Sequence, residues 1–391
     1  MQMALFKYSV IGVILSLNFS EQLFAKDLEF GNPEGEYGEL VVSGFLRAKY
    51  QDKSWTKNDR KLVFDAARLN LDYQKDKIFA RAEYRCYQFD KLCDFSALVD
   101  GYVGYKITEK DNIKLGVQTI PFGPTRFWET SYYGGINTQY GLEDVHNLGV
   151  NYQFEPIKNT TIDLGFYPTD AGNYRGSTKD AARYTTNFVK PDDAKNTYLQ
   201  EKNMWIGRIR QQLHFSDLPD LNASVGTSYW YSNIENKSNQ QTGQRNAWSA
   251  FGTMEYNNLN LILVMGQNNL KNKDSINPYS SLAGSFDGNY WLANKGDFYT
   301  ADVSYTFKNV GKLDSITPYA MHSSYIKDQP TFKNSIRNTV GVTFSHKSIM
   351  LQAEYIVSKN DLFVGGDEYA LAQGSSPKTK KLLNFQLFYH F

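Results

Sequence analysis

The sequence predicts an all-β fold, a single antiparallel transmembrane β-barrel of about sixteen strands. Three observations carry this prediction. Apolar residues recur at every second position over segments of about ten residues, as in barrel strands that face lipid on one side. The chain is rich in strand-forming aromatics, with 28 Tyr and 25 Phe, and its 29 Gly outnumber its 11 Pro. Short and long connections alternate between the segments, and no linker divides the chain into domains.

The N-terminus has the features of an export signal. Lys7 precedes an apolar run from Val10 to Leu17, and Ala25 offers a small residue at a suitable cleavage point. This run is far shorter than the ~20 apolar residues of a spanning helix, and no other segment approaches one. We expect residues 1–25 to be a cleavable signal peptide and residues 26–391 to form one barrel domain, with residues 26–37 as a periplasmic N-terminal stretch.

The period of two begins just after this stretch. Leu40, Val42 and Leu46 alternate with Ser43 and Arg47, so one strand face is apolar and the other polar. The same count predicts further strands near residues 68–73, 78–85, 95–107, 113–119, 147–155, 160–167, 203–215, 220–232, 246–256, 259–268, 297–307, 315–326, 336–346, 348–358 and 381–391.

The connections supply an independent indication of a barrel. Short turns are expected near residues 75–77, 156–159, 216–219, 257–258 and 347, and long loops near residues 51–60, 121–146, 168–202, 269–296 and 359–380. All the long loops fall on one side of the predicted sheet. Outer-membrane barrels pair short periplasmic turns with longer extracellular loops in this way.

The last segment, LLNFQLFYHF, has an apolar face formed by Leu383, Phe385, Leu387, Tyr389 and Phe391. A strand with so much apolar surface needs either a covering layer or lipid. An open sheet edge is not tolerated in hydrocarbon, so we expect this strand to pair with the first one and close the barrel.

The polar strand faces predict a charged lumen. The early strands contribute Arg47, Lys49, Arg68, Arg81, Arg85 and Lys114, together with Gln118, and a later strand adds Arg208 and Arg210. Inward acidic candidates are Glu255, Asp302 and Glu354. A basic wall facing an acidic one would produce a transverse field that favours one sign of ion. The alternative is that these residues are charged only because the lumen is wet.

The loop at residues 121–146 is the most informative one. It contains four glycines and the charged residues Arg126, Glu129, Glu143 and Asp144. Loops of this size are uncommon unless they are functional, and a sixteen-stranded barrel without a constriction would be a wide hole. We expect this third loop to fold into the lumen, with Glu129, or Glu143 and Asp144, facing the early-strand arginines. The alternative is an ordinary solvated surface loop.

Two adjacent segments carry a family resemblance. The stretches DGYVGYKI (residues 100–107) and NIKLGVQTIPFG (residues 112–123) resemble the phosphate-selective porin O and P family, in which a Tyr-Val-Gly-Tyr strand precedes a Lys/Gly/Gln strand ending in Pro-Phe-Gly. By motif the resemblance covers about residues 100 to 125. It implies a homotrimeric outer-membrane porin for small polar or anionic solutes, with Arg68, Arg81 and Arg85 at ladder-like positions. The terminal Phe391 is similar to the signal by which the barrel-assembly machinery recognises outer-membrane barrels.

The chain has two cysteines, Cys86 and Cys93, which flank a predicted turn near Phe89 and Asp90. Reflection of the two strands about this turn pairs them, and an exported chain passes through an oxidising compartment. We therefore expect a disulfide. The alternative is two small residues that remain reduced.

Other functions are less well supported. The five histidines are dispersed, and no HExxH motif, Cys/His metal spacing or nucleophile elbow is present, so we expect no enzyme, cofactor or metal. The formal net charge of +1 predicts no nucleic-acid partner. Two alternatives stay open: a non-conducting receptor or adhesion barrel, and a carbohydrate-selective porin with inward rings at Tyr87, Tyr102, Tyr167 and Trp230.

Overall fold

The computed structural model describes residues 27–57, 60–170, 183–191, 193, 196–286, 288–374 and 378–391. The expected signal peptide at residues 1–25 lies outside the described residues. Among the residues that are described, no helix is both long and apolar enough to cross a membrane.

The predicted barrel is confirmed: within the described residues, sixteen antiparallel wall strands form one closed sheet. Their bounds are β2 (Glu39–Lys53), β3 (Leu62–Lys75), β4 (Ile78–Tyr87), β5 (Phe95–Lys106), β6 (Asn112–Thr119), β7 (His146–Ile157), β8 (Thr160–Thr169), β10 (Leu199–Leu213), β11 (Leu221–Asn236), β12 (Gln241–Tyr256), β13 (Leu259–Lys271), β16 (Lys295–Tyr305) continued by β17 (Phe307–Val310), β18 (Leu313–Lys327), β19 (Ser335–His346), β20 (Ile349–Lys359) and β21 (Lys380–His390).

The barrel closes where the last strand pairs with the first, as expected. The ladder between β2 and β21 runs from Phe45 opposite His390 to Lys53 opposite Leu382. Phe391 extends it, because its backbone N–H donates to the carbonyl of Gly44 at 3.1 Å and its carbonyl accepts from the Gly44 N–H at 2.8 Å. No sheet edge is left open along this seam.

The outward positions of the wall strands are apolar and exposed. Leu115 is 63% exposed, Trp205 58% and Val340 62%, and each lies on the face opposite the polar positions of its strand. Aqueous solvent would make such a continuous apolar band unfavourable, whereas lipid would cover it.

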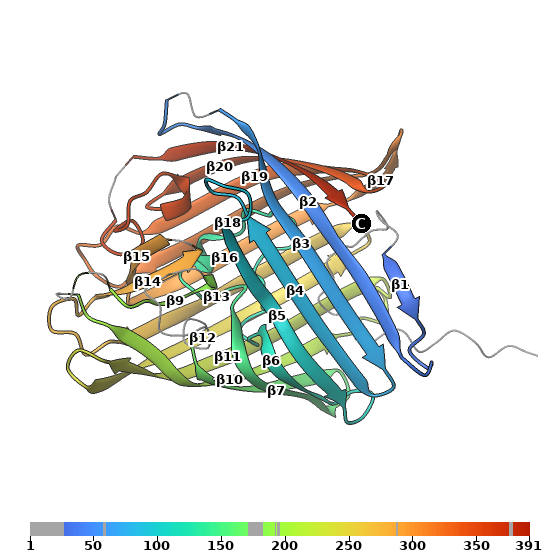
Figure 1. Cartoon of the computed structure of the whole chain (residues 1–391), viewed down its shortest axis with the longest axis horizontal. Coiled ribbons are helices and arrows are strands. Elements are labelled where there is room, and N and C mark those ends of the chain that lie inside the picture. The colour runs from blue at the N-terminus through green and yellow to red at the C-terminus, as the bar shows by residue number, and fades with distance from the viewer. Residues whose placement is uncertain are drawn as a thin grey trace, which may run out of the picture.

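The two ends of the barrel differ, as the connection lengths predicted (Figure 1). One end carries the tight turns together with the C-terminus, and the other carries the long loops. Not every connection at the loop end is long, because β11 and β12 are joined through residues 237–240 alone. These two strands have 16 residues each, so the wall itself rises higher there.

Four short strands were not predicted from the sequence. β1 (Leu28–Gly31) pairs with the start of β2, within the stretch expected to be periplasmic. The other three, β9 (Arg183–Phe188), β14 (Ser280–Phe286) and β15 (Gly288–Ala293), form a separate sheet within the fourth and sixth outer loops. In Figure 1 this small sheet lies at the loop end of the barrel.

The third loop folds into the lumen, as predicted. Phe122, Phe127 and Trp128 belong to one buried cluster with side chains of the far wall, of which Trp230 and Phe298 are 1% and 0% exposed. The loop also contains a short 3₁₀ helix, η1 (Ile136–Thr138), and the eighth loop contains another, η3 (Leu362–Val364). Part of the inner wall is therefore dry, whereas the sequence pattern predicted a wet inner face throughout.

Cys86 and Cys93 form a disulfide. The bond does not join two ladder positions, because Cys86 lies opposite Ser96 and Cys93 lies in the connection between β4 and β5. Cys93 has a φ of +56°, so the chain turns sharply there to bring its sulfur back to β4. The bond therefore ties the second outer loop to the wall.

The assigned faces predict that an added charge destabilises the barrel much more at an outward position than at an inward one. Val340→Arg places a cation on the middle of the lipid-facing band and should destabilise the barrel in lipid vesicles by about 2–4 kcal/mol. The control Glu255→Arg, at an inward and exposed position of β12, should change the unfolding free energy by less than about 1 kcal/mol. Denaturant titration in vesicles measures both, and equal effects would contradict the assigned faces.

Candidate pore lining and constriction

The polar side of the lumen is built by β2 to β6. The register places Arg68 between Phe45 on one side and Arg85 on the other. One row towards the loop end, Arg47 lies opposite Ala66, and two rows in the other direction Asp72 lies opposite Arg81. The register therefore puts these early-strand arginines on the inner face of one wall.

A β-bulge supplies the first carboxylate of this wall. Arg47 pairs with Ala66 and Ala48 pairs with Phe64, so Asp65 is an extra residue on β3. Its buried carboxylate forms ion pairs with Arg47 and Lys49. The sequence pattern missed Asp65 because a bulge shifts the parity of the strand.

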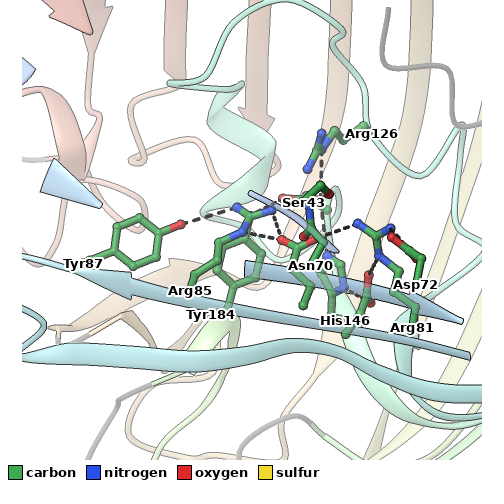
Figure 2. Close-up of polar contacts among 12 residues, drawn as sticks. Ser43, Asn70, Asp72, Arg81, Arg85, Tyr87, Arg126, His146 and Tyr184 are labelled. Atoms are coloured by element: carbon green, nitrogen blue, oxygen red, sulfur yellow. Dashed lines mark hydrogen bonds and ion pairs between the residues drawn. The ribbon is translucent and has the colours of Figure 1, made fainter. Parts of the chain in front are cut away.

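Further carboxylates neutralise Arg81 and Arg85. Arg81 contacts Asp72 at 2.9 Å, Glu83 at 3.0 Å and Asp100 at 3.5 Å. Arg85 pairs with the other oxygen of Glu83. Figure 2 shows Arg81 beside Asp72 and Arg85 beside Tyr87 and Tyr184, with the two arginines projecting from the same strand. The predicted basic wall is thus an alternating ion-pair network rather than a row of unpaired cations.

The third and fourth loops join this network. The Tyr184 hydroxyl on β9 donates to Asp144 at 2.6 Å and accepts from Arg85 at 2.8 Å. Arg126 and His146 also contact Asp144, at 3.1 Å and 3.4 Å (Figure 2). Burial alone would raise the pKa of Asp144, but Arg126, His146 and Arg85 hold this pKa well below its usual range.

The predicted acidic residues of the third loop separate in space. Asp144 reaches the early-strand arginines through Tyr184, as expected of one of the alternatives. Glu129 lies instead against the far wall, where its backbone N–H donates to Asp302 at 2.9 Å. Burial, together with the charges of Asp302 and Glu255, raises the pKa of Glu129 to about 7.

Two other residues that were predicted to face the lumen, Gln118 and Glu354, are buried and contact other parts of the protein. Gln118 is 0% exposed and donates to the carbonyls of Lys114 and Gly149, so it does not line the pore. These hydrogen bonds to backbone carbonyls of β6 and β7 could not be read from parity. Glu354 is buried and accepts from Ser131 of the third loop at 2.6 Å.

The other basic residues predicted to line the pore, Lys114, Arg208 and Arg210, have different surroundings. Lys114 lies 5.3 Å from the ring of Tyr102 on the polar wall. Arg208 pairs with Asp163 at 2.8 Å and donates to the Gly123 carbonyl, so it anchors the start of the third loop. Arg210, two residues further along β10, is half-buried.

Two of the inward rings considered for a sugar path are covered. Tyr167 and Trp230 are 0% and 1% exposed, because the third loop packs over them. Tyr87 and Tyr102 remain on the polar wall. Within the described residues, the arrangement does not form a continuous slide of exposed rings.

Arg337 clamps the far end of the third loop, and sequence reasoning did not select it. Its guanidinium pairs with Asp361 of the eighth loop at 2.7 Å and donates to the carbonyls of Tyr133, Gly134 and Gly135 at 3.0 to 3.2 Å. Burial would raise the pKa of Asp361, but Arg337 lowers it below the usual value. The inward parity of Arg337 on β19 is a signal that could have found it, but nothing in the sequence points to the loop carbonyls.

Glu143 is buried inside the third loop, away from the arginines it was expected to face. One carboxyl oxygen accepts from the Thr138 N–H at 2.8 Å and the Thr138 hydroxyl at 3.0 Å, and the other is buried without a partner. Burial raises the pKa of Glu143 to about 8, so the folded loop favours the protonated carboxyl.

The clamp predicts a large effect of Arg337→Met. This change leaves the buried Asp361 carboxylate unpaired and frees three loop carbonyls, so we expect destabilisation by about 3–5 kcal/mol and faster proteolysis within residues 121–146. The control Arg60→Met removes an ion pair whose arginine side chain is 65% exposed and should cost no more than about 1 kcal/mol. Unchanged cleavage of the loop would contradict the clamp.

The Glu143 site predicts a pH dependence of loop stability. Because the folded-state pKa of about 8 lies above the ordinary glutamate pKa of 4.5, stability is greatest below that lower value and falls as the pH rises towards 8. Hydrogen exchange of the loop amides, corrected for intrinsic rates, should therefore show less protection at the upper end of this window. Glu143→Gln should flatten the dependence, and a variant with the wild-type slope would contradict the assignment.

Comparison with known proteins supports the architecture. No family model and no curated protein matches the chain. Among solved structures, the outer membrane channel DcaP of Acinetobacter baumannii has a TM-score of 0.62 at 12% identity and covers 93% of this chain and 100% of its own. OmpF of Salmonella typhi, in complex with daunomycin, has a TM-score of 0.59 at 13% identity, with 93% and 100% covered.

A third similar structure is an anion-selective porin from Comamonas acidovorans, with a TM-score of 0.53 at 12% identity and 90% and 99% of the two chains covered. At these identities the likeness concerns the fold, and the narrower resemblance to the phosphate-selective family receives no support from it. The chain is a closed β-barrel with the fold of outer-membrane porins.

Proposed function

We propose that this protein is an outer-membrane porin, a water-filled channel through which small polar solutes diffuse passively, with a preference for anions. The observation that carries this proposal is the combination of an apolar outer band with a charged inner wall in one closed barrel. In a soluble protein the apolar outer band would be exposed to water. A transmembrane channel requires an apolar outer surface against lipid and a polar inner surface.

The infolded loop supports a channel of restricted width. It packs on the inner faces of β10 to β18 and leaves Arg126 and Tyr132 only partly covered, towards the polar wall. A solute that passes through the barrel would move between this loop and β2 to β6. The constriction is therefore lined by charged and aromatic side chains.

The charge count of the polar wall supports an anion preference. Six cationic residues of the predicted set lie there, Arg47, Lys49, Arg68, Arg81, Arg85 and Lys114. The inward acids that face them are Asp65, Asp72, Glu83 and Asp100, so positive charge remains in excess. Glu129, Glu255 and Asp302 oppose it from the other side, as a transverse field requires.

The proposal has three further parts. The chain would be exported through a signal peptide at residues 1–25 and assembled into the bacterial outer membrane by recognition of its terminal Phe391. It would function as a homotrimer. The similar structure from Comamonas acidovorans is that of an anion-selective porin, which agrees with the charge excess of the polar wall.

Planar-bilayer recording tests the channel and its selectivity together. Purified protein should give stepwise currents, and its reversal potential in a salt gradient should have the sign of an anion preference. Arg81→Ala leaves its three carboxylate neighbours in excess and should move the reversal potential towards cations, whereas Glu129→Gln should move it towards anions.

Arg60→Ala, at the exposed ion pair with Asp52, serves as the control and should leave selectivity unchanged. Folded protein that inserts but never conducts would overturn the proposal in favour of a receptor or adhesion barrel. Cation selectivity of the unmodified channel would overturn the anion preference alone.

A further inference from the structure

The outer surface of the barrel is hollowed over β3 to β6. An open groove of about 380 Å³ lies there, and small residues form its floor: Ala80 and Ala82 of β4 and Gly101 of β5. Ala82 lies directly opposite Gly101 in the ladder, so two neighbouring strands both lack a long side chain at this level. Figure 1 shows β3 to β6 side by side on the near side of the barrel.

Larger apolar side chains form the two sides of this groove. Leu71 and Tyr73 of β3 stand on one side, and Val103 of β5 and Leu115 of β6 stand on the other. One ladder row runs through Tyr73, Ala80, Val103 and Leu115, which places the alanine between the larger residues. Val103 and Leu115 belong to the exposed apolar band, so the groove opens towards the lipid.

The lining of the groove fits a flexible hydrocarbon chain. A chain that lies in it contacts the floor and both sides, and dispersion contacts add up over many atom pairs. A flat part of the wall offers a chain only one surface. An acyl chain in the groove therefore gains more contact than one elsewhere on the apolar band.

Two lysines lie beside the groove at the turn end of the barrel. Lys75 lies two residues beyond Tyr73 on the same face of β3, about 7 Å along the strand, and Lys77 lies in the turn that follows. The Lys75 ammonium group donates to the carbonyl of Glu36, and that of Lys77 donates to the carbonyl of Ile107 at 3.5 Å. Within the described residues, neither lysine forms an ion pair with a carboxylate.

These lysines can still bind an anion. An ammonium group has three N–H donors, so one backbone carbonyl leaves donors available on Lys75 and on Lys77. Asp76 lies between them in the sequence, and two lysines with one aspartate leave this turn with a net charge of +1. Lysines at a membrane surface attract anionic lipid head groups.

We propose that the groove and the two lysines form a binding site for an anionic phospholipid, with one acyl chain along Ala80, Ala82 and Gly101 and the head-group phosphate at Lys75 and Lys77. The lysines favour a lipid over a second copy of the chain, because a phospholipid joins an apolar chain and an anionic group in one molecule. This inference rests on the membrane location in the proposed function, but not on conduction.

Native mass spectrometry of the folded barrel in detergent tests the site with phosphatidylglycerol and phosphatidylcholine that have the same acyl chains. Phosphatidylglycerol should bind more tightly. Lys75→Gln and Lys77→Gln should each weaken its binding roughly fivefold, through loss of one cation near the membrane surface. The control Lys347→Gln, in the turn between β19 and β20 at the same end of the barrel, should leave binding unchanged.

A variant of the floor tests the groove itself. Ala82→Phe fills the space above the floor and should weaken the binding of both lipids by roughly tenfold or more, because several methylene groups lose their contacts. Ala353→Phe, at an outward position of β20 between Leu351 and Tyr355, is the matched control and should leave binding unchanged. The gel mobility of unheated and heated samples identifies any variant that fails to fold, and the lysine variants then still test the site.

Equal binding of the two lipids, or wild-type affinity in Ala82→Phe, would overturn the site. Loss of a complex between chains in Ala82→Phe, with lipid binding unchanged, would also overturn it, in favour of an interface between copies of the chain. A barrel that conducts but does not prefer phosphatidylglycerol refutes the lipid site only. A barrel that prefers this lipid without conducting refutes the channel only.

Discussion

A backbone hydrogen-bond ladder that closes on itself is the constraint on which the rest of this molecule depends. In hydrocarbon an open strand edge has no water to satisfy it, so the β2–β21 seam must pair completely. Phe391 continues the seam to Gly44, and where β21 has ended, β1 covers the edge of β2 from Glu39 to Val42. Phe391 and β1 thus cover the edge of β2 on either side of the point where β21 ends.

Closure of so many strands creates a lumen that side chains alone cannot fill, and the third loop divides it into two parts. On one side, Trp230 and Phe298 exclude water with Phe122 and Phe127 of the loop. On the other, the wall from β2 to β6 keeps its charges and its ion pairs. The loop shapes the passage by filling one half of the barrel and by presenting Tyr132 to the other.

The sequence predicts which face of a strand turns inward, but not what covers that face. The dyad pattern identified the wall strands and the infolded loop, because lipid enforces an apolar outer face over many residues. It treated Gln118 as pore-lining, although backbone carbonyls hold it, and it missed Asp65, where a bulge breaks the parity. The strands β9, β14 and β15 have no lipid-facing side, so no strict alternation marks them.

Ion pairing determines what the polar wall can do to a passing solute. Carboxylates within about 4 Å of Arg81 and Arg85 cancel most of their field at longer distances, so these residues act as a structural network more than as a ladder. Arg68 lies beside them, and its charge also acts on Glu83. Transport requires binding strong enough to attract a solute and weak enough to release it. A wall whose arginines are mostly paired with carboxylates meets that requirement better than a continuous row of unpaired arginines, which would hold an anion at every step.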